Sequence, residues 1–186
     1  MRKAALAGIL TLAAGGAGAE TPGGRAVDRM LFKGAAVEVE VIAQPFLPPD
    51  QAKLLPMVGQ GQPYYGAVAA SPDEGLLVEA TVAAANHHST EAAEAAARAE
   101  CDARRKGRTP CVTVALIRPS GWQPRPVTLS AAATEGFVQS FLRLRGDRAF
   151  AVSDSTGAWG AGAGAEAALA QCAAGGAADC RVIAAD

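Results

Sequence analysis

Hydrophobic and polar residues alternate near the start of the chain in a way that predicts one strand between two short helices. Val37–Val41 alternates valine with glutamate, which is typical of a strand with one side in solvent. Before it, Ala26–Phe32 places its apolar residues on one helical face. After a run of prolines, Asp50–Leu55 has the pattern of a second short helix, which we expect Pro56 to end.

The middle of the chain predicts two strands, a helix and a third strand. The turn Ser71–Gly75 contains the proline and glycine that a tight connection between strands needs. The helix is rich in alanine, and the glycine at its expected end is a good C-terminal residue. In order, we expect strand Tyr64–Ala70, strand Leu76–Ala85, a helix from Ser89 or Thr90 to Gly107, and strand Cys111–Ile117 closed by Pro119.

A shorter version of the same pattern follows near the C-terminus. A helix capped by Ser130 and running to about Leu144 separates the two versions. The second version then has strand Ala149–Val152, a brief strand around Trp159, a helix from Gly164 to Ala174, and strand Arg181–Ala184.

Each version therefore predicts the order ββαβ, and the two resemble copies of one unit. We expect residues 20–186 to form a single α+β domain that contains a repeat at 64–119 and a shorter repeat at 149–186. In this fold the helices pack on a mostly antiparallel sheet.

The first 19 residues have the features of a secretory signal peptide. Arg2 and Lys3 give a positive start, and Ala4–Ala14 is apolar but too short to span a bilayer. Ala17–Ala19 forms a small-x-small cleavage site, so we expect the mature chain to begin at Glu20 and to be periplasmic or secreted. No later segment is long and apolar enough for a membrane span.

Export favours disulfide bonds for the four cysteines. Four cysteines allow three pairings, and spacing alone does not choose between them. The pairing that treats both copies alike joins Cys101 to Cys111 and Cys172 to Cys180. These gaps do not match the spacing of structural zinc sites, so we expect no metal there.

The charge of the mature chain argues against binding to nucleic acid. Removing Arg2 and Lys3 leaves 15 basic residues against 18 acidic ones, a formal charge of −3. A nucleic-acid-binding domain needs a basic face.

His87 and His88 are the only histidines, and they stand side by side before a predicted helix. A secreted hydrolase would need one of them as its base, but no serine-hydrolase motif accompanies them. Adjacent residues seldom chelate one metal ion together, so polar loop residues are the better interpretation. We therefore identify no catalytic residue and no metal ligand.

Two further groups of residues have features of binding sites. Tyr64, Tyr65, Trp122 and Trp159 could line a ligand groove, although aromatic residues at strand starts and turns more often edge a core. Gly160–Ala165 matches a dinucleotide-binding fingerprint superficially. The strands and acidic residue that this fold requires do not follow, so close packing of glycine and alanine is the better explanation.

The cysteine, turn and helix order in Tyr64–Pro119 and Ala149–Ala184 resembles a small secreted bacterial domain of unknown function that occurs singly or in tandem. The whole chain also resembles exported bacterial proteins, some of which carry the name 5-aminolevulinate synthase. Such a synthase is a large cytoplasmic pyridoxal-phosphate enzyme. This chain is short, and none of Lys33, Lys53 and Lys106 has a recognisable cofactor setting. We therefore expect that name to be a misannotation and expect no cofactor.

Together these observations favour a non-enzymatic periplasmic or secreted protein that binds a small ligand or an exported partner. A small secreted hydrolase that uses His87 or His88 is the alternative.

Overall fold

A computed structural model describes residues 21–186 and shows an α+β protein with two antiparallel sheets. The expected signal peptide lies outside the described residues. The helices are α1 Gly24–Met30, α2 Pro49–Ala52, α3 Leu55–Gln60, α4 Thr90–Arg104, α5 Ala131–Gln139, the 3-10 helix η1 Phe141–Arg143, and α6 Gly164–Ala173. The strands are β1 Val37–Val41, β2 Gly66–Ala70, β3 Val82–Ala84, β4 Val112–Pro119, β5 Ala149–Ser153, β6 Trp159–Gly162 and β7 Cys180–Ala185.

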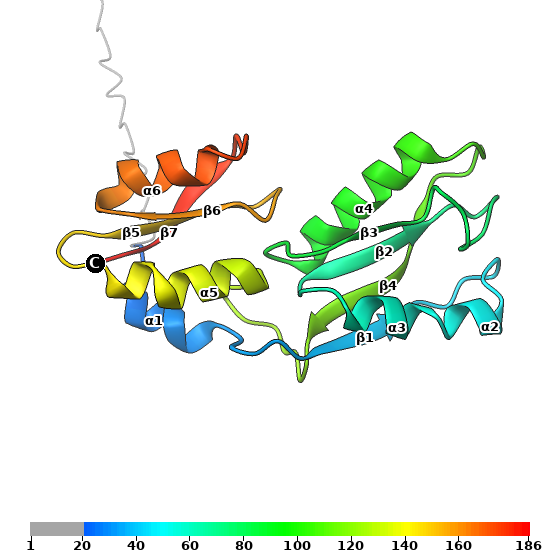
Figure 1. The fold of residues 1–186 in the computed structure, drawn as a ribbon, viewed down its shortest axis with the longest axis horizontal. Helices are drawn as coiled ribbons and strands as arrows, with labels where there is room; N and C mark the ends of the chain where they lie inside the picture. Colours follow the sequence, from blue (N-terminus) through cyan, green and yellow to red (C-terminus); the bar gives the residue numbers. More distant parts are fainter. Residues whose placement is uncertain (1–20) are drawn as a thin grey trace, which may run out of the picture.

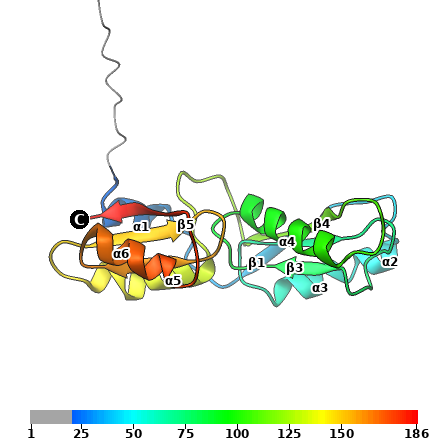
Figure 2. The ribbon, with the colours of Figure 1, turned by 90° about the horizontal axis from the view of Figure 1, so that it is seen from above.

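Each sheet is the centre of a three-layer unit, and the two units lie side by side (Figure 1). In unit one, the strand order is β1-β4-β2-β3, with α4 on one face and α2 and α3 on the other. In unit two, the order is β6-β5-β7, with α6 on one face and α5 and α1 on the other. Figure 2 shows the same two units, again next to each other, after a rotation of 90°.

The two units share their order of elements, which is compatible with an internal repeat. The sequence β2-β3-α4-β4 in unit one corresponds to β5-β6-α6-β7 in unit two, and in both units the first strand of the group lies between the other two. A register shift also interrupts the β2–β4 pairing and the β5–β7 pairing. Unit one has an additional strand, β1, which pairs along the outer edge of β4.

Small side chains bring α4 close to the sheet of unit one. Ser89 caps the helix by accepting a hydrogen bond from the backbone N–H of Ala92 at 3.1 Å. Ala93 and Ala97 are fully buried and face the small residues of β2 in one apolar cluster. Alanine carries little side-chain entropy and favours helix, so the same residues support both the helix and its close packing.

The disulfides close the junction between helix and strand in each unit. Cys101 is paired with Cys111, with their Cα atoms 6.0 Å apart, and Cys172 is paired with Cys180 at 6.1 Å. This is the pairing that treats both copies alike. The Cα distances lie in the ordinary range for disulfides.

Aromatic residues fill the core of unit two beneath its sheet. The ring of Phe137 in α5 lies 4.7 Å from that of Phe141 and 5.0 Å from that of Phe150 in β5. Trp159 stacks on Phe150 with a ring distance of 5.5 Å. Gly160 on β6 faces α6, where a Cβ atom would collide with the helix backbone. The Gly/Ala segment therefore serves close packing.

Apart from shifts of a few residues at element ends, three predicted elements differ from the observed ones. The strand expected at Leu76–Ala85 is paired only over Val82–Ala84, because Thr81 closes a turn by donating its backbone N–H to the carbonyl of Val78. Pro56 does not end a helix; it lies in the first turn of α3, where a missing N–H costs nothing. The helix expected to reach Leu144 ends at Gln139 and is followed by η1.

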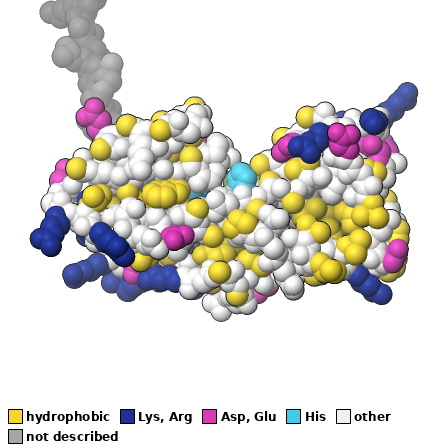
Figure 3. All heavy atoms as spheres, viewed as in Figure 1, with side chains coloured by type: hydrophobic (Ala, Val, Ile, Leu, Met, Phe, Trp, Pro, Cys, Tyr) yellow, Lys and Arg dark blue, Asp and Glu magenta, His cyan; other side chains and the backbone are white. Residues whose placement is uncertain are grey.

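In the part of the chain that the structure describes, no helix is long and apolar enough to cross a membrane. An exposed apolar patch on α3 and the residue before it is visible on unit one (Figure 3). Its members are Leu54, Met57 and Val58.

Candidate functional site

The loop between β3 and α4 lies at the junction between the two units. Its residue His88 makes hydrogen bonds to unit two. The side chain is only 4% exposed. Its Nδ1 accepts a hydrogen bond from the backbone N–H of Ser130 at 3.1 Å, and its Nε2 lies 2.9 Å from the carbonyl oxygen of Ala158. The first bond requires an unprotonated Nδ1, so Nε2 carries the proton and donates it to Ala158.

His88 is therefore held as a neutral imidazole between two parts of unit two. Ser130 caps α5, and Ala158 lies in the turn between β5 and β6. Burial lowers the pKa of His88, because the low-dielectric surroundings disfavour the charged form. With both ring nitrogens bound to backbone groups, this side chain joins the units and has no free nitrogen for catalysis.

His87 has a different environment. Its backbone N–H donates to the carbonyl of Tyr65 at 3.0 Å, which extends the β2–β3 pairing beyond the strands. Its ring is half-buried, and burial lowers its pKa. Within residues 21–186, no hydrogen bond joins either histidine to a hydroxyl or a carboxylate. Histidine atoms reach the surface in the notch between the units (Figure 3).

Asn86 adds a second connection between the units at the same loop. Its φ angle of 64° lies in the left-handed region, which asparagine tolerates better than most residues. Its side-chain oxygen accepts a hydrogen bond from the backbone N–H of Ala132 in α5 at 3.0 Å. Gly157 packs against the carbonyl of Asn86 so closely that a Cβ atom would collide with it.

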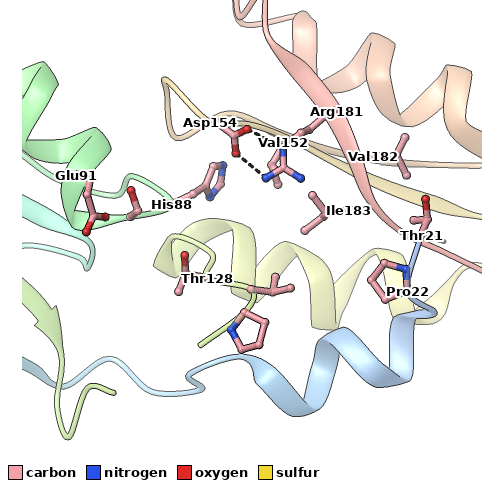
Figure 4. Close-up of a pocket in the computed structure, with 13 residues that line it drawn as sticks. Thr21, Pro22, His88, Glu91, Thr128, Val152, Asp154, Arg181, Val182 and Ile183 are labelled. Atoms are coloured by element: carbon pink, nitrogen blue, oxygen red, sulfur yellow. Dashed lines mark hydrogen bonds and ion pairs between the residues drawn. The ribbon is translucent and has the colours of Figure 1, made fainter. Parts of the chain in front are cut away.

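A pocket of about 670 Å³ opens beside His88, and we call it the inter-unit pocket (Figure 4). Unit one contributes the start of α4, and unit two contributes the ends of β5 and β7. Segments before α1 and between β4 and α5 complete its walls. The lining residues are Thr21, Pro22, His88, Ser89, Glu91, Pro126, Val127, Thr128, Val152, Asp154, Arg181, Val182 and Ile183.

The charges around the inter-unit pocket are unequal. Arg181 donates from Nε and Nη2 to the two carboxylate oxygens of Asp154, at 2.6 and 2.8 Å (Figure 4). This bidentate bond raises the pKa of the Arg181 guanidinium. Glu91, in the first turn of α4, forms no ion pair with any described residue. Since His88 is neutral, the pocket carries a net negative charge.

The four aromatic residues considered as a groove do not line one common surface. Tyr65 and Trp122 line a cavity of about 360 Å³, and Tyr64 lines a different one of about 540 Å³. Both tyrosines are almost fully buried, and burial raises the pKa of Tyr65 to about 12. Trp159 belongs to the aromatic core of unit two.

The described residues contain no group of three or more histidine, cysteine, aspartate or glutamate side chains arranged to hold a metal ion. Lys33 is one of the three lysines considered above as cofactor lysines. Its ammonium forms an ion pair with the carboxylate of Asp28 at 2.7 Å.

The sequence did not indicate the inter-unit pocket. Its lining extends from Thr21 to Ile183, so only the docking of the units brings these residues together. One local signal was Glu91 in the first turn of α4, an acidic side chain that favours the helix start and here also lines the pocket. Comparisons with protein-family models, with curated proteins and with solved structures find no match to this chain.

Proposed function

We propose that this protein is an exported, non-enzymatic binding protein, periplasmic or secreted, whose ligand or partner occupies the inter-unit pocket. The observation that carries the proposal is the pocket itself. It has about 670 Å³ of space, walls from both units and an unpaired Glu91 at its side. Its lining combines apolar side chains, among them Val127, Val152 and Ile183, with polar and charged ones such as Glu91 and Asp154, and binding sites use polar groups of this kind to orient what they bind. The two disulfides and the N-terminal signal pattern support an oxidising compartment.

The hydrolase alternative has less support. It needs a histidine with a free ring nitrogen beside a nucleophile. His88 uses both nitrogens for backbone contacts, and His87 has no hydroxyl or carboxylate partner among the described residues.

The test is affinity capture from a periplasmic extract with the oxidised protein, compared with a variant whose pocket is filled. Thr128→Trp places a large ring at a half-buried position that lines both the inter-unit pocket and the neighbouring cavity of about 360 Å³. Ala170→Trp, on the exposed side of α6, adds the same ring away from it. We expect a component that the wild type and Ala170→Trp retain and Thr128→Trp loses. Equal retention by all three would refute a function located in this pocket.

Export is tested separately by mass analysis of protein from the native host. We expect the chain to begin at Glu20, because the small-x-small site ends at Ala19. A cytoplasmic chain that still begins with Met1 would contradict the proposed compartment.

A further inference from the structure

Strand β7 has an outer edge without a strand partner. Its inner edge pairs with β5 from Cys180 to Ala185. On the outer edge, a single backbone hydrogen bond is formed within residues 21–186, from the N–H of Ala185 to the carbonyl of Pro22 at 3.2 Å. The stretch before it, Arg181–Ile183, lines the inter-unit pocket instead (Figure 4). The open backbone edge and the pocket are therefore one continuous surface.

Unit one shows what fits at the corresponding position. Its strand β4 occupies the place that β7 has in unit two, after the helix and beside the first strand of the group. The outer edge of β4 is covered by β1, which pairs antiparallel with it over Val37–Val41. The alternating side chains of β1 place valines against the core and glutamates outward. Among the described elements, unit two has no strand in this position.

We propose that the outer edge of β7 binds an extended peptide segment of an exported partner protein as a fourth strand of the sheet of unit two. This inference rests on the proposed function and specifies its partner. An open sheet edge presents N–H and C=O groups in a row, which only another extended main chain can pair in register. The open part, Cys180–Ile183, accommodates about four residues, or roughly 13 Å of strand.

The pocket walls define the side chains that such a peptide needs. Alternate side chains of a strand point to opposite faces, so every second residue of the peptide would face the apolar wall formed by Val127, Val152 and Ile183. Arg181 already neutralises Asp154, which leaves Glu91 as the unbalanced charge. We therefore infer a peptide of alternating apolar and polar residues with a lysine or arginine placed near Glu91.

A second copy of this chain fits the edge less well than a peptide. The edge lies in a recess whose walls are α4 of unit one and the segment Pro126–Thr128. The β7 edge of a second copy is flanked by the same walls and by the same Glu91, so close approach would bring like charges together. A single extended peptide carries neither these walls nor this negative charge.

The experiment selects linear peptides from a phage-displayed random library on the oxidised full-length protein. The enriched peptides are then synthesised, and their dissociation constants are measured by fluorescence anisotropy. We expect alternating apolar and polar sequences with a basic residue. Thr128→Trp should weaken their binding by at least about tenfold, and Glu91→Gln by about three- to tenfold. Ala170→Trp should change the affinity by less than about twofold. Hydrogen exchange of the amides in Cys180–Ala185 should slow when peptide is bound.

Three results would overturn the proposal. The first is a library that yields no enriched peptide. The second is an enriched peptide that binds Thr128→Trp as tightly as wild type or leaves the exchange of Cys180–Ala185 unchanged. The third is a concentration-dependent dimer that Thr128→Trp abolishes, which would assign the edge to a second copy. If a periplasmic component still depends on Thr128 while peptides fail, the binding function stands and the peptide inference falls.

Discussion

Replacing His88 by leucine tests whether this side chain holds the two units together. Leucine is similar in size and apolar, so it fills the site without supplying a donor or an acceptor. The substitution removes the bond to the N–H of Ser130 and the bond to the carbonyl of Ala158. These two losses differ in their cost.

The free-energy cost of each lost hydrogen bond depends on whether its backbone partner keeps another one. The carbonyl of Ala158 still accepts a hydrogen bond from the N–H of Ser153 at 3.0 Å, so this loss is worth about 1 kcal/mol. The N–H of Ser130 is buried and has no second acceptor among the described residues, so leaving it unpaired costs about 1–3 kcal/mol. We expect the free energy of unfolding to fall by about 2–4 kcal/mol in total.

Urea denaturation at neutral pH measures this free energy, and His87→Leu is the matched control. His87 lies next in the chain, but Nδ1 of its half-buried ring has no hydrogen-bond partner in the described structure. Its replacement should change the stability by less than about 1 kcal/mol. The reasoning is refuted if His88→Leu costs less than about 1 kcal/mol, or if both variants lose the same amount.

Three further predictions concern pH, the disulfides and the aromatic core. Burial lowers the pKa of His88 below its ordinary value of 6.5. As the pH falls below that value, His88 therefore binds a proton more readily in the unfolded chain than in the folded protein, and the folded state loses stability. Unfolding experiments from about pH 7 to 5 should show a greater loss of stability in wild type than in His88→Leu. Replacing Cys101 and Cys111 together by serine should cost about 3 kcal/mol in urea denaturation, since a bridge across a sequence separation of 10 restricts the unfolded chain; a non-reducing peptide map that links either cysteine to the other pair would contradict this arrangement. Gly136→Ala should destabilise the protein by about 1–3 kcal/mol because its Cβ atom would collide with the ring of Trp159; a gain in stability, as for an ordinary glycine in a helix, would show that the ring is not packed there.

Much of the secondary structure could be predicted because local chemistry determines it. Ser130 caps α5 through its hydroxyl group as expected, and of the two candidates for the start of α4, Ser89 and Thr90, it is Ser89 that caps the helix. The valine and glutamate alternation gave β1 with the expected bounds. Prediction was less accurate where an irregular local turn interrupts a strand: β3 is shorter than expected because the N–H of Thr81 closes a turn on the carbonyl of Val78.

The candidate site was beyond local prediction because contacts between distant parts of the chain build it. His88 was expected in a loop before a helix, and it lies there. Its two hydrogen-bond partners, however, are 42 and 70 positions away in the chain. No periodicity or motif relates residues at such separations, so the role of His88 and the inter-unit pocket depend on how the two units dock.

The chain does not build its two units one after the other. Helix α1 belongs to unit two: Val27 packs with Phe137 and Phe141, and the backbone N–H of Gly24 donates to the side chain of Asp186 at 2.9 Å. The strand that follows, β1, belongs to unit one. Unit two is therefore assembled from a segment that precedes unit one and from segments that follow it.

Synthesis from the N-terminus gives this arrangement a temporal consequence. The strands of unit one all lie at or before Pro119, so a chain that is made or translocated from its N-terminus can complete this sheet before the strands of unit two follow. The apolar face of α1 has to wait for partners that follow much later in the chain, including Ile183 and Ala184 of β7. During that interval α1 is a nascent amphipathic segment with its apolar face uncovered, which is the kind of intermediate that chaperones bind.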